Sequence, residues 1–274
     1  MDQPLVTNRT SASGALPTLP RWRPATLRPL LLPLLLLGLW QLVIVLEVFD
    51  RSQLPSPLDV LLAAREMIRR NELHIHIGIS VLRVLQGFTV GSLIAIMLGL
   101  AVGLSLTVES FVAPTLQAIR AVPSLAWVPL LILWMGIDEA PKITLVAIGV
   151  FFPVYTNLVA GIRGIDRKLV EVGHAYGLNS LDLVRHILLP AALPALSTGL
   201  RIGLAQGWLF LVAAELIAAS RGLGFLLIDS QNTGRSDIIV LSIVLLALIG
   251  KLSDWLLQRL ERRWLRWQDA YKGQ

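Results

Sequence analysis

Glu171-Val172-Gly173-His174-Ala175-Tyr176-Gly177 and, after nine further residues, Ile187-Leu188-Leu189-Pro190 belong to a short polar and amphipathic part of this chain. Strongly apolar stretches lie on both sides of it. A polar segment of this kind in a membrane protein indicates a surface on which a soluble partner docks. Residues 160–190 are therefore the first candidate for a functional site.

The residues within this segment predict a helix, a sharp turn and a second helix. Asp166 has the position and side chain of an N-cap for a helix that begins directly after it. Gly177 suits the left-handed conformation that often ends a helix. Asn179 or Ser180 can start the next helix, and Asp182 lies at the capping-box spacing from Asn179.

The composition identifies an integral membrane protein. The chain has 274 residues, of which 55% are hydrophobic and 15% charged, whereas soluble domains carry about 25% charged residues. It contains no cysteine, which excludes disulfides and thiolate metal sites, and we expect no metal site of any kind. Its net charge of +6 comes from residues that flank apolar stretches, so we expect no nucleic-acid binding.

Six apolar stretches predict an all-α, polytopic integral membrane protein with about six transmembrane helices. They span residues 30–48, 79–106, 121–135, 143–159, 192–219 and 238–257. Pro123 and Pro129 interrupt the third stretch, which we expect to be kinked or partly re-entrant. Pro190 has no amide hydrogen and suits the first turn of the fifth. Glycines four residues apart in the second and fifth stretches predict close helix packing.

The basic residues predict that both termini lie in the cytoplasm. With the N-terminus inside, the inner segments carry fourteen of the 24 lysines and arginines and the outer segments carry seven, as the positive-inside rule requires. Residues 1–29 are predicted to be a disordered basic tail, and residues 258–274 a second basic tail. This orientation places residues 160–190 on the cytoplasmic side.

Residues 49–78, between the first two apolar stretches, are predicted to lie outside the cytoplasm and to contain an amphipathic helix. Ser56, Pro57 and Asp59 fit a helix start with a capping box. The apolar residues that follow recur at helical spacing. We expect this helix to lie on the membrane surface and to orient the second stretch.

The segment quoted first resembles the signature loop of ABC-importer permeases, in which Glu-Ala-Ala, three residues and Gly precede nine residues, Ile, any residue and Leu-Pro. The matching positions are Glu171, Gly177, Ile187, Leu189 and Pro190. Val172 and Gly173 replace the two alanines. In that family the loop forms a helix that sits in a groove of a cytoplasmic ATPase. The resemblance therefore implies ATPase docking here, with His174 in the helix and with Gly173 and Ala175 small enough for close contact.

The resemblance extends from Leu54 to Tyr271 and includes the permeases for nitrate, taurine and, above all, aliphatic sulfonates. The stretches that carry it are Leu54–Pro57, Arg83–Phe88, Gly103–Ser105, Arg120–Pro123, Pro129–Glu139, Phe151–Pro153, Ala213–Ala218, Gly222–Gly224 and Leu260–Trp267. One departure is Trp134-Met135-Gly136, where Trp-Phe-Gly is usual.

This resemblance implies a type I ABC-importer transmembrane domain, which we place at residues 79–257, in a bacterial inner membrane. It also implies a homodimer, two cytoplasmic ATPase subunits and an extracytoplasmic binding protein that delivers the substrate. ATP and Mg would then bind the ATPase, while this chain holds no cofactor and catalyses no reaction.

Six residues are candidates for lining the substrate path, because they are polar or aromatic and lie in or beside predicted spans. They are Arg120, Trp134, Asn157, Gln206, Trp208 and Glu215. Arginine matches oxyanions well, although a role in topology also fits Arg120. An ionised group inside a span is costly, so we expect Glu215 to serve a structural or gating role, paired with Arg201 or Lys251.

Two other classes of protein fit this sequence less well. An intramembrane hydrolase would need a base near a nucleophile such as Ser105, and no histidine lies in a predicted span. An ion-coupled secondary transporter would need broken helices at corresponding places in its two halves, whereas only the third stretch is broken. The chain also lacks the glycine-rich phosphate-binding motif through which many ATPases hold their nucleotide.

Overall fold

The computed structural model describes residues 28–50 and 52–265, and in these ranges it contains helices and no strand, as the sequence predicts. The elements are α1 Arg28–Val45, α2 Pro57–Arg69, α3 Leu73–Leu104, α4 Leu106–Ala121, a 3-10 turn Ser124–Ala126, α5 Trp127–Met135, α6 Glu139–Arg163, α7 Arg167–Ala175, α8 Ser180–Leu183, a π turn Val184–Leu188, α9 Leu189–Ala218, α10 Leu223–Asn232 and α11 Ser236–Trp264. The predicted tails fall largely on residues 1–27 and 266–274, outside the described residues.

The described chain forms two compact units, one that ends at Val48 and one that begins at Phe49. In the first unit, α1 is an apolar helix of 18 residues that corresponds to the first predicted span. Its length is close to the roughly 20 residues that cross a bilayer. All other elements belong to the second unit.

Four helices among the described residues are long and apolar enough to cross a membrane. They are α3, α6, the continuous helix Ser180–Ala218 that includes α9, and α11. These four match the second, fourth, fifth and sixth predicted spans. The third, residues 121–135, is not one span, because it holds only the 3-10 turn and the nine residues of α5. Most of α4 lies between the second and third predicted stretches and was not predicted. Of the two prolines expected to interrupt the third stretch, Pro123 lies at a break between α4 and α5, whereas Pro129 lies within α5 and does not interrupt it.

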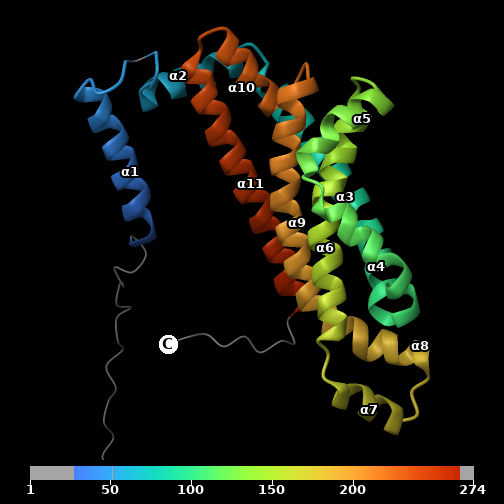
Figure 1. Ribbon diagram of the computed structural model, residues 1–274. Helices are drawn as coiled ribbons and strands as arrows, with labels where there is room; N and C mark the ends of the chain where they lie inside the picture. The colour runs from blue at the N-terminus through green and yellow to red at the C-terminus, as the bar shows by residue number, and fades with distance from the viewer. Residues whose placement is uncertain (1–27, 51, 266–274) are drawn as a thin grey trace, which may run out of the picture. The chain divides into compact units, whose positions relative to one another are not determined.

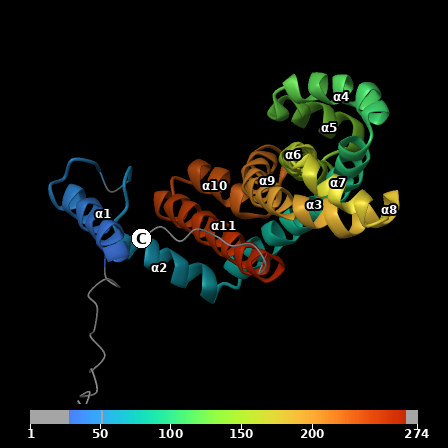
Figure 2. The same ribbon diagram turned by 90° about the horizontal axis from the view of Figure 1, so that it is seen from below.

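Helix α6 lies between α3 and α9 and carries the centre of the core (Figure 1; Figure 2). Val146, Val150 and Val154, four residues apart along α6, are fully buried. Branched side chains at this spacing form one continuous stripe along a helix. They pack in one cluster with Val84 of α3 and Leu211 of α9, so the three long helices form the rigid part of the molecule.

Glycines allow α6 to approach both of its neighbours closely, as the four-residue spacing predicts. A Cβ atom at Gly91 of α3 would lie 2.5 Å from the carbonyl oxygen of Ala147. A Cβ atom at Gly199 of α9 would lie 3.1 Å from the carbonyl oxygen of Pro153. Small residues at such crossings let helices pack backbone to backbone in a bilayer.

The long helices have two distinct ends (Figure 1). We call the end that carries α7 and α8 the loop end, and the end that carries α2, α5 and α10 the far end. Helix α2 begins with the predicted capping box, since the Ser56 hydroxyl accepts from the amide of Asp59 and the Asp59 carboxylate accepts from the amide of Ser56. Helix α2 then packs on α11.

An ion pair strengthens the contact between α2 and α11. The guanidinium of Arg235, just before α11, lies 2.8 Å from the Asp237 carboxylate and 3.1 Å from the Glu66 carboxylate. Hydrogen bonds to Asp237, and secondarily to Glu66, raise the pKa of Arg235 above its ordinary value. The arginine is therefore charged at every physiological pH and links the amphipathic helix to the final span.

Candidate functional site

Loop 160–190 is built by the local signals that the sequence predicts. The Asp166 carboxylate accepts a hydrogen bond of 2.9 Å from the amide of Lys168 and caps α7. Gly177 has a φ of +72°, and the amides of Gly177 and Leu178 donate to the carbonyls of His174 and Gly173. This pattern of bonds is a Schellman motif, which ends α7 at the glycine.

The second half of loop 160–190 runs into the membrane helix without a break. The Asn179 side chain caps α8 by accepting from the amide of Asp182 at 2.9 Å. The turn Val184–Leu188 is a π turn, and α9 follows directly with Pro190 in its first turn. A proline cannot donate to the carbonyl four residues before it, and a widened turn accommodates this loss. Pro190 lies in the first turn of α9, as expected, but no new helix begins there, because Ser180–Ala218 is one continuous helix.

Several large apolar side chains of loop 160–190 are exposed at the loop end. Leu169, Val172, Tyr176 and Leu181 are respectively 47%, 51%, 84% and 77% exposed. Glu171 is exposed on the same helix and pairs with Arg167 at 3.2 Å. Exposed apolar side chains near a charged one on a polar loop are typical of a protein–protein interface.

Gly173 faces the inside of this loop, which differs from its expected place at the docking surface. It is buried, and a Cβ atom there would lie 2.4 Å from a methyl of Leu183 and 2.7 Å from a methyl of Ile187. Glycine is needed because α7 rests directly on the start of the next helix. Ala175 and His174, by contrast, are exposed.

Three of the six candidates for the substrate path line one cavity. The polar cavity, as we call it, has a volume of about 370 Å³ and lies between α4, α6 and α9. Its lining residues are Arg120, Ile148, Gly149, Phe152, Pro153, Thr156, Asn157, Ile202, Gln206 and Phe210. Arg120 stands at the end of α4, Asn157 lies in the last third of α6 and Gln206 lies near the middle of α9.

The guanidinium of Arg120 is available to a ligand. It makes no hydrogen bond or ion pair with any residue that the structure describes. The side-chain amide of Asn157 donates to the carbonyl of Pro153 at 2.8 Å, which fixes its orientation. Gln206 contributes a further amide to the same lining. A cation beside two amides inside a membrane protein can bind a small oxyanion.

The other three candidates lie elsewhere. Trp134, near the end of α5, is 65% exposed and does not line the polar cavity. Trp208 is buried, and its indole N–H donates to the Ser253 hydroxyl at 3.0 Å, so it joins α9 to α11. Glu215 is fully buried at the far end of α9.

Glu215 belongs to a buried ionic network that the sequence reasoning did not find. Its carboxylate accepts hydrogen bonds from Arg83 at 2.7 Å, from Ser80 at 2.8 Å and from the amide of Gly224 at 2.8 Å. The expected partners were wrong. Arg201 pairs with Asp254 at 3.0 Å, and Lys251 also faces Asp254.

Arg83 is the centre of this network. Its side chain also binds the Glu139 carboxylate through two bonds of 2.6 Å and the carbonyl of Arg221 at 2.7 Å. Lys142 contacts the same Glu139 at 3.2 Å, so two cations balance two carboxylates. The signal in the sequence was an arginine within an apolar stretch, which demands a counter-charge that a single sequence does not identify.

The close turn after α9 is shaped around this network. Gly222 has a φ of +128°, and a Cβ atom there would lie 2.4 Å from the Glu215 carboxylate. Its amide donates to Nδ1 of His76, and the amide of Leu223 donates to the Ser80 hydroxyl. The network therefore holds α3, α6, α9 and α10 together at the far end. Among the described residues, no cluster of histidine and carboxylate side chains fits a metal ion.

Comparisons with known proteins agree with these features. Residues 87–266 match the family described as "Binding-protein-dependent transport system inner membrane component". A protein named as an aliphatic sulfonates transport permease in Escherichia coli is 44% identical over 243 residues, which cover 89% of this chain and 92% of that protein. A protein of the same name in Bacillus subtilis is 39% identical over 253 residues and 92% of both chains.

The fold has a match among solved structures. A chain of the MetNI methionine ABC transporter, in a structure described as inward facing, superposes with a TM-score of 0.59. The match covers 68% of this chain and 92% of that one, at 21% sequence identity, and it concerns the fold alone. With the family match over most of its length, this chain belongs to the binding-protein-dependent inner membrane components, the permease subunits of ABC importers for sulfonates, taurine and nitrate.

Proposed function

We propose that this chain moves aliphatic sulfonates, or closely related small oxyanions, into the cytoplasm as the permease of an ATP-driven importer. The observation that carries the proposal is the polar cavity, which is lined by Arg120, Asn157 and Gln206 together. Sulfonate is a tetrahedral anion that a guanidinium binds through several hydrogen bonds. The names of the similar permeases support the same substrate class.

Loop 160–190 is the proposed contact with the ATPase. The exposed side chains of Leu169, Val172, Tyr176 and Leu181 supply apolar area, and the exposed Glu171 supplies a charge. The Schellman turn at Gly177 and the continuous helix beyond it make the loop stiff. ATP and Mg bind the ATPase in this scheme, and the permease transmits the motion.

The remaining partners follow from the same scheme. Two copies of the chain enclose the path, two ATPase subunits bind their loops on the cytoplasmic side, and a binding protein delivers the anion to the far end. Both termini then lie in the cytoplasm of a bacterial cell, with the permease in the inner membrane. The chain performs transport without chemical catalysis.

The substrate class is tested by reconstitution. Proteoliposomes would carry this chain with its cognate ATPase and binding protein, and we would measure uptake of taurine, a longer alkanesulfonate and nitrate. We expect uptake of a sulfonate that requires ATP and all three components. Uptake by this chain alone, without ATP, would contradict the proposal and favour a secondary transporter.

The docking role is tested by two variants of loop 160–190. Glu171→Lys reverses an exposed charge of this loop, and Gly177→Pro cannot adopt the positive φ of the turn. We expect both to stay in the membrane but to lose ATP-driven uptake and to retain less ATPase on purification. Glu72→Lys, the same charge reversal at the far end, is the control. Normal uptake by either loop variant would refute the docking assignment.

A further inference from the structure

A second cavity, the apolar pocket, lies beside the polar cavity. It has a volume of about 360 Å³ and is lined by residues of α3, α4, α5 and α6. Its lining residues are Val90, Gly91, Ile94, Leu116, Ile119, Trp127, Ile143, Thr144, Ala147, Ile148, Phe151 and Phe152. Thr144 carries the one side-chain hydroxyl of this lining, and no charged side chain contributes to it.

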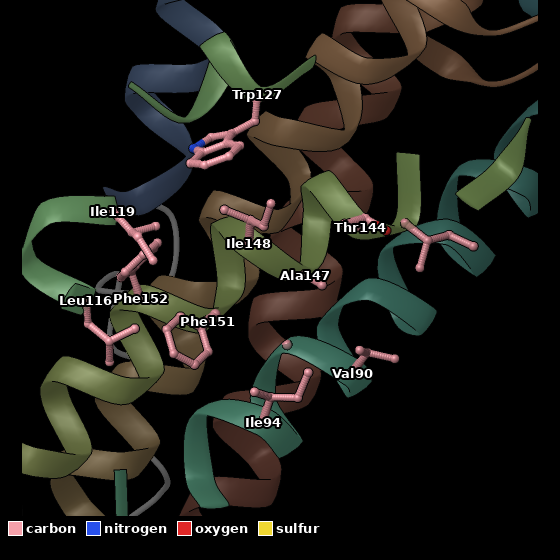
Figure 3. A pocket seen from close by; sticks show the side chains of 12 residues that line it. Val90, Ile94, Leu116, Ile119, Trp127, Thr144, Ala147, Ile148, Phe151 and Phe152 are labelled. Atoms are coloured by element: carbon pink, nitrogen blue, oxygen red, sulfur yellow. The ribbon is translucent and has the colours of Figure 1, made fainter. Parts of the chain in front are cut away.

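The side chains of the apolar pocket converge from opposite sides (Figure 3). Val90 and Ile94 project from α3 on one side, and Leu116 and Ile119 project from α4 on the other. Trp127 lies across one end of the space. An apolar ligand in this space would therefore be contacted by side chains of several helices.

The two cavities share part of their lining. Ile148 and Phe152 of α6 line both the polar cavity and the apolar pocket. On α4, Arg120 follows Ile119 directly and lies one helical turn after Leu116, so its side chain starts beside the apolar wall. A cation at the edge of an apolar pocket complements a molecule with an anionic head and an alkyl chain.

We propose that the apolar pocket holds the alkyl chain of an alkanesulfonate whose head binds Arg120, which makes the permease itself selective for chain length. This inference rests on the proposed function, because it assigns a chain-binding subsite next to the proposed anion site. The alkyl chain of the ligand passes Phe152 between the two cavities. The sulfonate stays in the polar cavity with Arg120, Asn157 and Gln206.

A free amphiphile fits this geometry better than a membrane lipid. The polar cavity lies around the middle of α9, where its lining runs from Ile202 to Phe210. The centre of a bilayer is about 15 Å from either edge of its hydrocarbon core. A phospholipid with its head at Arg120 would have to bring that head to this depth, whereas a single-chain substrate reaches it through the path.

The size of the effect follows from the hydrophobic contribution of each methylene. Burying one methylene in an apolar site favours binding by about fourfold. A chain of eight carbons thus gains far more from the pocket than a chain of two. Filling the pocket should therefore act against long substrates in particular.

The first test fills the pocket and compares chain lengths. Ile94→Trp places a bulky ring in the pocket. Leu93→Trp is the matched control, because Leu93 is the next residue on α3, is similarly exposed (56% against 49% for Ile94) and lines neither cavity. We would measure ATP-driven uptake of octanesulfonate and ethanesulfonate with the same binding protein throughout, so that its own preference cancels. We expect the octane-to-ethane ratio to fall at least tenfold in Ile94→Trp and to be unchanged in Leu93→Trp.

An unchanged ratio in Ile94→Trp would overturn the inference. So would an equal loss of both substrates, because that result indicates damaged packing or a lipid site. The proposed function has a separate readout, namely uptake of either sulfonate by the unaltered chain.

The second test measures binding without transport. The chain contains no cysteine, so Ile94→Cys and Leu93→Cys each carry a single thiol. We expect octanesulfonate, but not ethanesulfonate, to slow the reaction of Ile94→Cys with an apolar maleimide at least fivefold. Leu93→Cys should react at the same rate throughout. The protection should disappear when Arg120→Gln is added, because the anionic head then has no cation.

The outcomes separate the two proposals. Protection of Ile94→Cys in a protein that imports no sulfonate would refute the proposed function and keep the pocket assignment. Import of sulfonates without selective protection would refute the pocket assignment alone. Equal protection at both thiols, or protection that survives Arg120→Gln, would show general membrane partitioning or lipid binding and would also refute it.

Discussion

The guanidinium of Arg83 donates to the carboxylate of Glu215 at 2.7 Å, although 132 positions of sequence separate the two residues. Both side chains are buried, with 4% and 0% of their surface exposed. Their bond joins α3 to α9 at the far end, and Glu139 extends it to α6. The far end is thus fixed by charges, whereas the middle of the helices is fixed by apolar packing.

Removing the charge of Glu215 should destabilise the protein strongly. Glu215→Gln leaves the buried Arg83 with an incomplete set of partners, which typically costs about 3–5 kcal/mol. We expect a clear fall in the thermal unfolding midpoint in detergent. Glu109→Gln is the matched control, since its pair with Arg163 is about one-third exposed and such pairs contribute only about 0–1 kcal/mol. Equal effects of the two variants would contradict the structural role of Glu215.

Substituting Gly222 should disrupt the same network through the backbone. In Gly222→Ala, the new methyl would lie 2.4 Å from the Glu215 carboxylate, at a φ that side chains rarely adopt. Gly234→Ala is the control, because Gly234 also has a positive φ but has open space around it. Its cost should be only the conformational strain of about 1–2 kcal/mol. The two variants would be compared by their yield after solubilisation in detergent and by their unfolding temperature. Similar yields and unfolding temperatures for Gly222→Ala and Gly234→Ala would speak against the close contact at Gly222.

The approach of α3 to α6 predicts a different sensitivity at two glycines of one helix. Gly91→Val places its side chain against the backbone of Ala147, whereas Gly78→Val meets nothing within 4 Å. We expect Gly91→Val to be destabilised by about 1–3 kcal/mol or more, as overpacked sites are, and Gly78→Val to resemble the unaltered protein. Monodispersity on gel filtration and thermal unfolding would distinguish them. A well-behaved Gly91→Val would rule out the close crossing.

Enlarging Gly173 should affect the packing of loop 160–190, whereas enlarging Ala175 should affect only its contact with the ATPase. Gly173→Val must push Leu183 and Ile187 aside, so loop 160–190 should become sensitive to limited proteolysis. Ala175→Val alters only an exposed position, so proteolysis should be unchanged and any effect should fall on ATPase retention. If Ala175→Val opens the loop as much as Gly173→Val does, the inward position of Gly173 is wrong.

Features that depend on neighbouring residues were predictable from the sequence. The capping box of Ser56 and Asp59, the cap at Asp166 and the turn at Gly177 all form as expected. Each depends on a hydrogen bond or a backbone angle within a few residues. The break at Pro123 has the same local origin, because a proline cannot continue the helix pattern of amide donors.

Features that depend on distant residues were not predictable in this way. The need of Glu215 for a cation follows from its burial, but the choice of Arg83 over Arg201 depends on how α3 and α9 pack. The inward face of Gly173 likewise depends on where α8 folds back. Arg120, Asn157 and Gln206 were each recognisable as polar residues beside spans, and only the fold brings them to one cavity.

The unbroken helix Ser180–Ala218 gives the loop and the membrane core a common mechanical part. Its 39 residues make a rod of about 58 Å at 1.5 Å per residue, nearly twice the roughly 30 Å of the hydrocarbon core. Gly199, at its midpoint, packs against the backbone of α6. If α3, α6 and α9 tilt together as one body by about 10° around this point, each end of the rod moves by roughly 5 Å, in opposite directions. A push on α8 at the loop end would therefore move Glu215 and its charge network at the far end in the opposite direction.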